Sequence, residues 1–149
     1  LREMNEKIRE DQLRKFYYCA VHGTMPRRED TLYGWLVKDS RNNMVTVSDR
    51  KMPGGKQIIT KYRVCRVRDG NSLLEVELVT GRTHQIRVHF SHLGHPLCGD
   101  FMYGQEIEGM KGCALHSCAI TLTQPSTGEP LAFTAPDPPV FAKLLEGTL

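Results

Sequence analysis

The chain has 149 residues, of which 40% are hydrophobic and 25% are charged. These values are typical of an ordinary globular domain, and no apolar stretch approaches the roughly 20 residues that a membrane-spanning helix needs. The formal net charge of +3 allows an RNA partner but is weak support for one. The first residues, LREMNEKIRE, are charged throughout and show no signal peptide.

Alternating apolar and polar residues predict strands along most of the chain, and helices are expected at three places. In chain order we expect a helix over residues 1–12, strands over 15–23, 31–39, 43–49, 56–70 and 72–81, a helix over 83–93, strands over 112–125 and 131–136, and a short helix over 138–147. This order predicts the α+β class, with a mixed, mostly antiparallel sheet and a few flanking helices. No repeat or linker interrupts residues 1–149, which we treat as a single domain.

The central helix is expected to begin near Thr83, which is a suitable N-cap residue. Ile86, Phe90 and Leu93 share one face of this helix, so we expect them to pack on the core. Gly94 is suited to end the helix, because glycine readily adopts the left-handed conformation found there.

Four histidines lie on this helix or directly after it, at positions 84, 89, 92 and 95. With about 3.6 residues per turn they fall on one face, away from the apolar stripe. We interpret them as hydrogen-bonding surface and packing residues. A metal site is the alternative, but the stretch has no HExxH motif and no Asp or Glu between Glu77 and Asp100, so we expect no metal.

Arg82 sits between the end of a strand and the start of the helix. Free backbone N–H groups at a helix start favour an anion, and a guanidinium beside them would strengthen a seat for a carboxylate or a phosphate. Arg87 is one turn further on and could reach the same region or an RNA backbone. An ordinary surface salt bridge explains Arg82 equally well on local grounds, so both interpretations stay open.

The stretch KFYYCAV places Tyr17 and Tyr18 on opposite faces of a strand. One of the two should therefore belong to the core, and the other should face outward or line a cleft. A tyrosine that faces a cleft can stack on a nucleobase, since every base has a π-face. A plain core aromatic is the alternative for Tyr17.

Basic residues also cluster outside the helix. Arg27 and Arg28 are adjacent, and Arg63 and Arg66 lie on the strand expected over residues 56–70. These arginines are candidate contacts to RNA phosphates, which give salt-sensitive binding without sequence choice. A solvated strand face is the alternative, and we favour it for that strand considered alone.

The five cysteines, at positions 19, 65, 98, 113 and 118, are odd in number and form no CxxC pair. Their apolar surroundings favour buried reduced thiols in a cytosolic protein. A zinc site would require paired spacing, which this pattern lacks.

The stretch TGRTHQIRVHFSHLGHPLCGDFMYG, followed by ALHS and PSTGEPLAFTAP, resembles the RluA/RluD-type pseudouridine synthases. KFYYCAV is similar to the K-x-Y-x-x-x-V strand of that family. The resemblance implies a cytoplasmic isomerase that converts uridine in structured RNA to pseudouridine without a metal or organic cofactor. By the number of family members, it implies ribosomal RNA rather than tRNA as the substrate.

The resemblance also implies roles for individual residues. In this family an aspartate acts at the ribosyl carbon of a flipped-out uridine, and the base detaches, rotates and rejoins through carbon. Arg82 matches the arginine that pairs with this aspartate, and Tyr17 matches the tyrosine that packs on the target base and takes part in proton removal. Leu115 matches an apolar contact in the pocket, which we expect His84 and Gln85 to line as well.

The R-L-D-x-x-T/S-S-G motif that carries the family's aspartate does not occur in this sequence. We therefore expect residues 1–149 to be the C-terminal part of a synthase catalytic domain, inactive alone, whose N-terminal part and nucleophile are absent. The start without Met agrees with a truncated chain. The exposed sheet edge of such a fragment would favour self-association. A non-catalytic RNA-binding module and, third, a metal-dependent hydrolase built on the histidines are the alternatives.

Overall fold

The computed structural model describes residues 13–124, 126–136 and 141. The helices expected over residues 1–12 and 138–147 lie outside these described residues, apart from Phe141. The elements of the described part are, in chain order, β1 (Arg14–His22), β2 (Glu29–Asp39), β3 (Met44–Ser48), β4 (Lys56–Arg68), β5 (Asn71–Leu78), α2 (Gln85–His92), β6 (Leu115–Thr123) and β7 (Pro130–Thr134).

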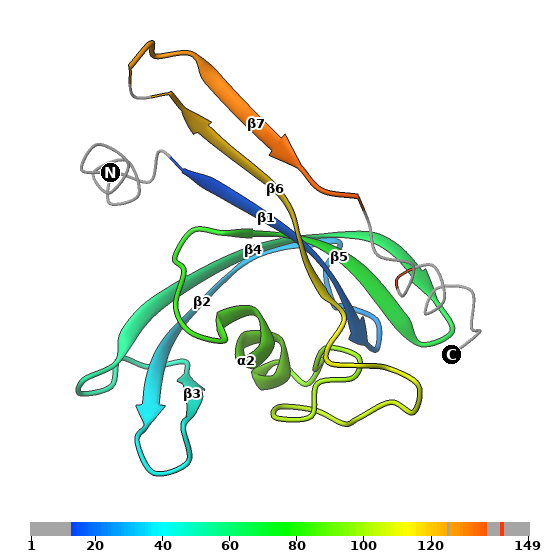
Figure 1. The fold of residues 1–149 in the computed structure, drawn as a ribbon. Helices are drawn as coiled ribbons and strands as arrows, with labels where there is room; N and C mark the ends of the chain where they lie inside the picture. The colour runs from blue at the N-terminus through cyan, green and yellow to red at the C-terminus, as the bar shows by residue number, and fades with distance from the viewer. Residues whose placement is uncertain (1–12, 125, 137–140, 142–149) are drawn as a thin grey trace.

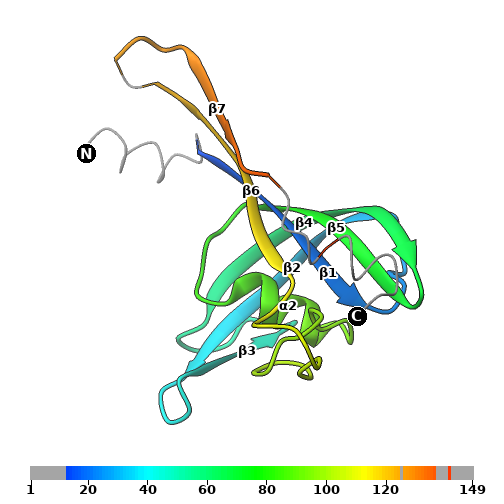
Figure 2. The ribbon, with the colours of Figure 1, turned by 45° about the vertical axis from the view of Figure 1, so that its right-hand side comes forward.

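The strands form one sheet in the order β3-β2-β4-β5-β1-β6-β7, and every neighbouring pair is antiparallel. Helix α2 packs against β3 and β4, and Figure 1 shows β2, β4 and β5 curving around it. The hairpin of β6 and β7 extends away from α2 as an arm, which Figure 2 shows from a second angle. The mostly antiparallel α+β fold is confirmed, and α2 corresponds to the helix expected over residues 83–93. Every described strand pair is antiparallel, so the sheet is not mixed within this part of the chain.

Strand β5 shows why the sheet has one apolar face. Leu74, Val76 and Leu78 are buried and alternate with Glu75 and Glu77, which are only partly covered. The two glutamates form ion pairs with arginines of β4 and β1, the strands on either side. Alternation thus sends the apolar side chains into the core, while opposite charges pair across the other face.

The core below α2 is built on Phe90, which is fully buried and meets the ring of Tyr62 edge-on, with ring centroids 5.8 Å apart. Burying such a side chain contributes about 1.5–3 kcal/mol. Ile86 is also buried, as expected, but Leu93 is 40% exposed. The prediction was wrong for Leu93 because the helix ends at His92. Gly94 has a φ of +87° and follows the C-terminal cap, as predicted.

The start of α2 differs from the prediction. The N-cap residue is His84 rather than Thr83, it has a left-handed backbone with a φ of 56°, and no side chain caps the helix from that position. The side chain of Gln85 instead bridges back, and its Oε1 accepts hydrogen bonds from the backbone N–H of Arg82 (3.0 Å) and from Thr80 Oγ1 (2.9 Å). These bonds fix the turn that precedes the helix, and they do not cap the N–H groups of its first turn.

The four histidines do not share one exposed face. His89 is 1% exposed, and its Nδ1 lies 2.8 Å from Thr60 Oγ1. Burial, together with repulsion from His92, lowers the pKa of His89 to about 4. The predicted placement away from the apolar stripe is wrong for His89, but its interpretation as a hydrogen-bonding packing residue is confirmed, because Thr60 of β4 is its partner inside the core. Across the described residues, no group of three or more His, Cys, Asp or Glu is placed to hold a metal.

All five cysteines are free. Cys19, Cys98 and Cys118 are buried as expected, and burial raises the pKa of the Cys98 thiol to about 11. Cys65 is exposed, against the prediction, because β4 shifts register between Val64 and Arg66, and this irregularity interrupts the alternation of faces. No helix among the described residues has the length and apolar character to cross a membrane.

Candidate active site

A cavity of about 200 Å³ opens beside the start of α2. It contains every residue predicted for catalysis and for the substrate pocket, together with Arg87. The lining residues are Tyr17, Leu78, Arg82, His84, Gln85, Ile86, Arg87 and Leu115. They come from β1, β5, β6, α2 and the connection between β5 and α2. The fold thus brings together residues that are almost one hundred positions apart in the sequence.

Tyr17 and Leu115 form part of the apolar side of the cavity. Tyr17 is partly buried and packs on the core cluster beneath α2, whereas Tyr18 packs on a second cluster on the other face of the sheet. This confirms that the two tyrosines face opposite ways. The pairing of β1 with β6 shifts register between Phe16 and Tyr17, so the sheet is irregular where Tyr17 meets the cavity.

Arg82 stands at the rim of the cavity on an exposed turn. Among the described residues, no carboxylate forms an ion pair with its guanidinium. The surface salt bridge considered from the sequence is therefore not formed by these residues. The backbone of Arg82 is nevertheless fixed by the hydrogen bond to Gln85. The backbone at Arg82 is thus held in place, while the exposed guanidinium has no ion-pair partner among the described residues.

Lys15 is a second cation near this turn that sequence analysis missed. A Cβ placed on Gly81 would lie 2.5 Å from Lys15 Nζ, so the missing side chain of Gly81 is what allows the ammonium to approach. Lys15 is half-buried, in register with Leu78 of β5. The signal that could have found it is the lysine of the K-x-Y match, two residues before Tyr17.

Gln85 organises the wall of the cavity. It is 2% exposed, and besides accepting hydrogen bonds from Arg82 and Thr80, its Nε2 donates to the carbonyl of Ile59 (3.1 Å) and to Thr60 Oγ1 (3.0 Å). An amide side chain has two donor hydrogens and two acceptor sites, so these four bonds occupy its usual capacity. Gln85 therefore shapes the turn that carries Arg82, and its polar atoms are engaged inside the protein.

His84 is oriented by Tyr103, which sequence analysis did not single out. His84 Nδ1 lies 2.9 Å from the Tyr103 hydroxyl, and the two rings meet edge-on. The same hydroxyl accepts a hydrogen bond from the backbone N–H of Val45 (3.2 Å). The GDxxYG part of the motif was the available signal for Tyr103.

Arg87 is anchored inside the protein by Asp100. Its Nε and NH2 groups donate to the two carboxylate oxygens of Asp100 at 2.8 and 2.7 Å, and Asp100 is fully buried. Burial would raise the pKa of Asp100, but hydrogen bonds from Arg87 and from the backbone N–H groups of Tyr103 and Met102 outweigh it, so the pKa is lowered. Arg87 thus lines the cavity while two of its guanidinium nitrogens donate to Asp100. Its predicted RNA contact stays a prediction.

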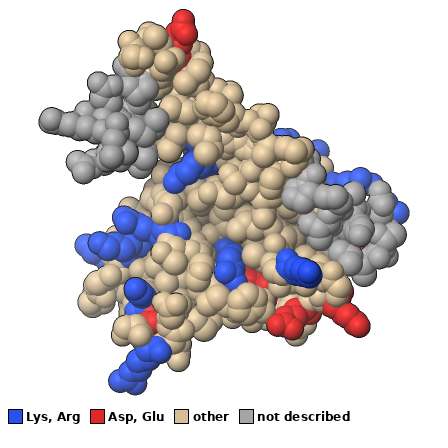
Figure 3. All heavy atoms as spheres, viewed as in Figure 1, with Lys and Arg blue, Asp and Glu red and all other residues tan. Residues whose placement is uncertain are grey.

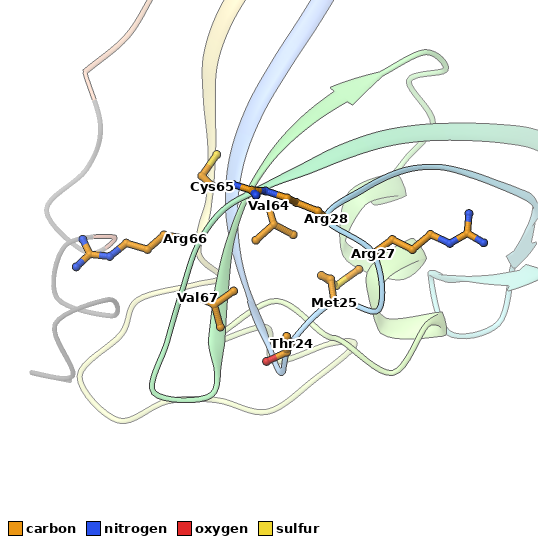
Figure 4. Close-up of a pocket in the computed structure, with 8 residues that line it drawn as sticks. All are labelled: Thr24, Met25, Arg27, Arg28, Val64, Cys65, Arg66 and Val67. Atoms are coloured by element: carbon orange, nitrogen blue, oxygen red, sulfur yellow. The ribbon is translucent and has the colours of Figure 1, made fainter.

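Three of the four remaining predicted arginines border a hollow of about 320 Å³ between β4 and the segment before β2. Figure 4 shows Arg27 and Arg66 pointing away from each other, with Met25 and Val67 between them. Arg28 lines the same hollow. Its floor is therefore apolar, and the charges lie at its margins.

Arg63 lies apart from this hollow and pairs with Glu75 of β5 at 3.2 Å. Arg27 has an acidic neighbour too, Asp30, at 3.9 Å. Both arginines are more than half exposed, so these pairs hold them only weakly. They therefore stay accessible to an anionic partner.

The face that carries the cavity is basic. Figure 3 shows Lys and Arg gathered over the β5–α2 connection and the β2–β3 hairpin, while Asp and Glu appear mainly at the lower right and at the tip of the arm. A surface of one charge beside a cavity attracts a polyanion. The charge on this face therefore suits a polyanionic partner such as a nucleic acid.

Comparison with known proteins agrees with this geometry. The model of a family described as "RNA pseudouridylate synthase" matches residues 1–92. An uncharacterized RNA pseudouridine synthase of Bacillus subtilis, YjbO, is 36% identical over 135 residues, which cover 91% of this chain and 47% of the relative. The ribosomal large subunit pseudouridine synthase C of Vibrio vulnificus is 32% identical over 143 residues, covering 91% of this chain and 44% of that protein.

Two solved structures share the fold. Human RNA pseudouridylate synthase domain containing 1 aligns with a TM-score of 0.76 and 25% identity, over 93% of this chain and 61% of that one. Human RNA pseudouridylate synthase domain containing 4 aligns with a TM-score of 0.78 and 20% identity, over 97% of this chain and 66% of that one. The chain spans about half the length of the curated relatives it matches. With its fold, its cavity and a family match over more than half of its length, the chain belongs to the RNA pseudouridylate synthase family.

Proposed function

We propose that this chain forms one side of the active site of an RNA pseudouridine synthase, an isomerase that converts uridine in structured RNA to pseudouridine. The observation that carries the proposal is the single cavity that joins Tyr17, Arg82 and Leu115. The cavity, at about 200 Å³, is smaller than the roughly 300–1,000 Å³ of pockets for drug-sized ligands. It therefore suits a single pyrimidine ring.

Such a ring must leave its stack before it can enter, because atoms of a stacked base are inaccessible to an enzyme. Tyr17 then packs on the flipped uracil, and Leu115 contacts it from β6. During isomerisation the base detaches from the ribose, rotates and rejoins through a ring carbon, and the proton on that carbon must leave. We propose that Tyr17 takes part in this proton removal, which its position in the cavity lining supports. The route requires no metal or organic cofactor.

The step at the ribosyl carbon needs a carboxylate nucleophile, and no carboxylate lines the cavity in the described part of the chain. Asp100 lies close by, but it is buried and engaged by Arg87. We propose that the aspartate comes from residues outside these 149 and pairs with Arg82. Support comes from the exposed guanidinium of Arg82, for which the described residues supply no acidic partner.

The proposed substrate is ribosomal RNA, modified in the cytoplasm. The name of the Vibrio vulnificus relative, ribosomal large subunit pseudouridine synthase C, supports this RNA class. Arg27, Arg28, Arg63 and Arg66 are exposed, and we propose that they contact phosphates. Such contacts position an RNA without reading its sequence and weaken as salt rises.

Replacing Arg82 by lysine in the natural protein tests the proposal. Lysine keeps the charge but loses the planar fork that binds a carboxylate at two points. Tritium release from RNA labelled at uridine C5 should fall by about tenfold or more, while RNA affinity stays within about twofold. Arg68→Lys, on the exposed end of β4, is the matched control and should leave both unchanged. Full activity of Arg82→Lys would refute the proposed pairing.

The origin of the nucleophile has its own test. The 149-residue chain and the natural protein are compared by tritium release and by carbodiimide mapping of pseudouridine. We expect turnover from the natural protein and none from the 149 residues alone. Robust turnover by the 149-residue chain would show that it contains its own nucleophile.

A non-catalytic RNA-binding module is the second candidate, favoured by the lack of a described carboxylate partner for Arg82. It predicts RNA binding by the natural protein with no pseudouridine formed. Self-association also stays a prediction. The described sheet ends in β3 on one side and β7 on the other, and strands at such edges have unpaired backbone groups that can recruit a second chain.

A further inference from the structure

A second cavity, of about 360 Å³, adjoins the first one on the other side of Arg82 and His84. These two residues line both cavities, so their side chains form the partition between them. The second cavity lies among the β2–β3 hairpin, the start of β4 and the β5–α2 connection. The proposed uridine chemistry makes no use of it.

The floor of this cavity is apolar and its margin is cationic. Leu36 and Val45 are buried, and Met44 beside them is partly exposed. Lys38 and Lys56 line the same cavity and are exposed. No Asp or Glu is among its lining residues. An apolar floor suits the face of a nucleobase, and unpaired cations at the margin suit phosphates.

Hydrogen bonds connect His84, in the partition between the cavities, to the β2–β3 hairpin. The backbone N–H of Val45 and the ring of His84 meet at the hydroxyl of Tyr103, so one side chain links the floor of the second cavity to the wall of the first. The spacing between the two cavities is therefore held by hydrogen bonds. Figure 3 shows that this face carries the cluster of Lys and Arg described above.

We propose that the second cavity receives the nucleotide adjoining the target uridine in the same RNA strand. The inference rests on the proposed function, since a uridine that unstacks to enter the first cavity leaves its neighbour without a stacking partner. The apolar floor of the second cavity, on the other side of Arg82 and His84, replaces that lost stacking contact. Its greater volume, about 360 Å³ against about 200 Å³, admits a purine as well as a pyrimidine.

Asn43 gives this subsite a means of base preference. It lines the cavity on the β2–β3 turn, with a φ of 51°, and its side-chain amide has both donors and an acceptor. Lys38 and Lys56 would meanwhile hold the phosphates on either side of the base. The subsite would therefore add affinity to every RNA and a modest preference for particular flanking bases.

The test uses the natural protein and a short fluorescein-labelled oligoadenylate with one central uridine. Matched oligonucleotides carry an abasic nucleotide immediately 5′ or immediately 3′ of the uridine. We expect one of the two abasic changes to weaken binding by about fivefold or more, measured by fluorescence anisotropy. Met44→Ala should weaken binding of the intact RNA, yet add nothing to the loss caused by that abasic change, because both remove the same contact.

The charged margin is tested with the double variant Lys38→Ala/Lys56→Ala, and Lys61→Ala/Lys111→Ala is its matched control on residues outside the cavities. We expect the first variant to weaken binding by about fivefold or more and to reduce the salt dependence by about 1.4 in log–log slope, and the control to do neither. A similar effect of both double variants would overturn the inference. So would equal binding of intact and both abasic RNAs, or no binding of the intact RNA.

Competition with free adenosine monophosphate distinguishes two possible occupants of the second cavity, a nucleotide within an RNA strand and a free mononucleotide. Competition by the mononucleotide, with no effect of either abasic position, would indicate a mononucleotide site and overturn the inference. Failure of the proposed function is distinguishable, because it would appear as absent pseudouridine formation. If RNA binding depends on the flanking base but no pseudouridine forms, the subsite is supported and the proposed catalytic function is rejected.

Discussion

Arg87 and Asp100 form a two-point ion pair in which both carboxylate oxygens of a fully buried aspartate accept hydrogen bonds from one guanidinium. Removing one charge of a buried pair leaves the other uncompensated, which costs about 3–5 kcal/mol. We predict that Asp100→Asn lowers the free energy of unfolding of the natural protein by about this amount in urea at neutral pH. Asp49→Asn, which breaks the exposed pair with His92, should change it by no more than about 1 kcal/mol.

The acid limb of the stability curve supplies a further check on this pair. The pKa of Asp100 lies below its ordinary value of 3.8, so the stabilisation is complete above that value and is lost as the pH falls through the lower folded-state pKa. Asp100→Asn should lack this loss. Equal acid sensitivity of the variant and the wild type would show that other carboxylates dominate there.

His89 predicts a pH dependence at milder values. Its folded pKa of about 4 lies below the ordinary 6.5, so the unfolded chain binds the proton more readily between these values. Stability should therefore decrease as the pH falls from 6.5 to 4, with a slope of up to about 1.4 kcal/mol per pH unit from this residue. In His89→Gln this component should vanish, whatever the stability at neutral pH. His92→Gln removes only the smaller of the two causes and leaves the burial of His89 in place, so it should retain most of the slope, as measured by urea unfolding across the range.

The contact between Tyr103 and His84 predicts an effect on turnover. Tyr103→Phe keeps the ring but removes the hydroxyl that orients His84 and accepts from Val45 N–H. We expect turnover in the tritium assay to fall by about fivefold to tenfold, with a loss of about 1–2 kcal/mol in unfolding free energy. Tyr33→Phe, on an exposed tyrosine of β2, should change neither. Matching results for the two variants would mean that His84 has no role that depends on its orientation.

Much of the fold follows from local patterns in the sequence. The alternation of apolar residues with Glu75 and Glu77 is enough to predict which residues of β5 are buried, and Asp69-Gly70 is a typical turn sequence between two strands. The misses have long-range causes. Burial of His89 depends on Thr60 from β4, and the exposure of Cys65 depends on a register shift between paired strands. Neither can be read from one segment alone.

The residues of the candidate site likewise fall into a predicted group and a group that sequence analysis missed. Tyr17, Arg82 and Leu115 were predicted from a resemblance to a family, because nothing in their local patterns places them in one cavity. Lys15 and Tyr103 escaped prediction because their importance lies in what they approach: the turn at Gly81 for the first, His84 for the second. Short motifs identify the residues of such a site, whereas the contacts between them come from the folded sheet.

Two glycines near the site lead to opposite predictions. Gly99 has a φ of +78°, and a Cβ there would lie 2.7 Å from the backbone carbonyl oxygen of Gly112, which cannot easily move. Gly99→Ala should therefore lower the free energy of unfolding by at least about 1–2 kcal/mol. A Cβ on Gly81 meets only the flexible end of Lys15, so Gly81→Ala should change stability by less than about 1 kcal/mol.

The activity of Gly81→Ala should nevertheless fall, because the new methyl group displaces the ammonium of Lys15 from the turn that carries Arg82. We expect a loss of about threefold to tenfold in tritium release at low salt, since a cation is worth most to a polyanion when screening is weak. Lys15→Gln should show a similar loss, and combining the two changes should add little to either alone. Additive losses would mean that the alanine acts on Arg82 directly, without the displacement of Lys15.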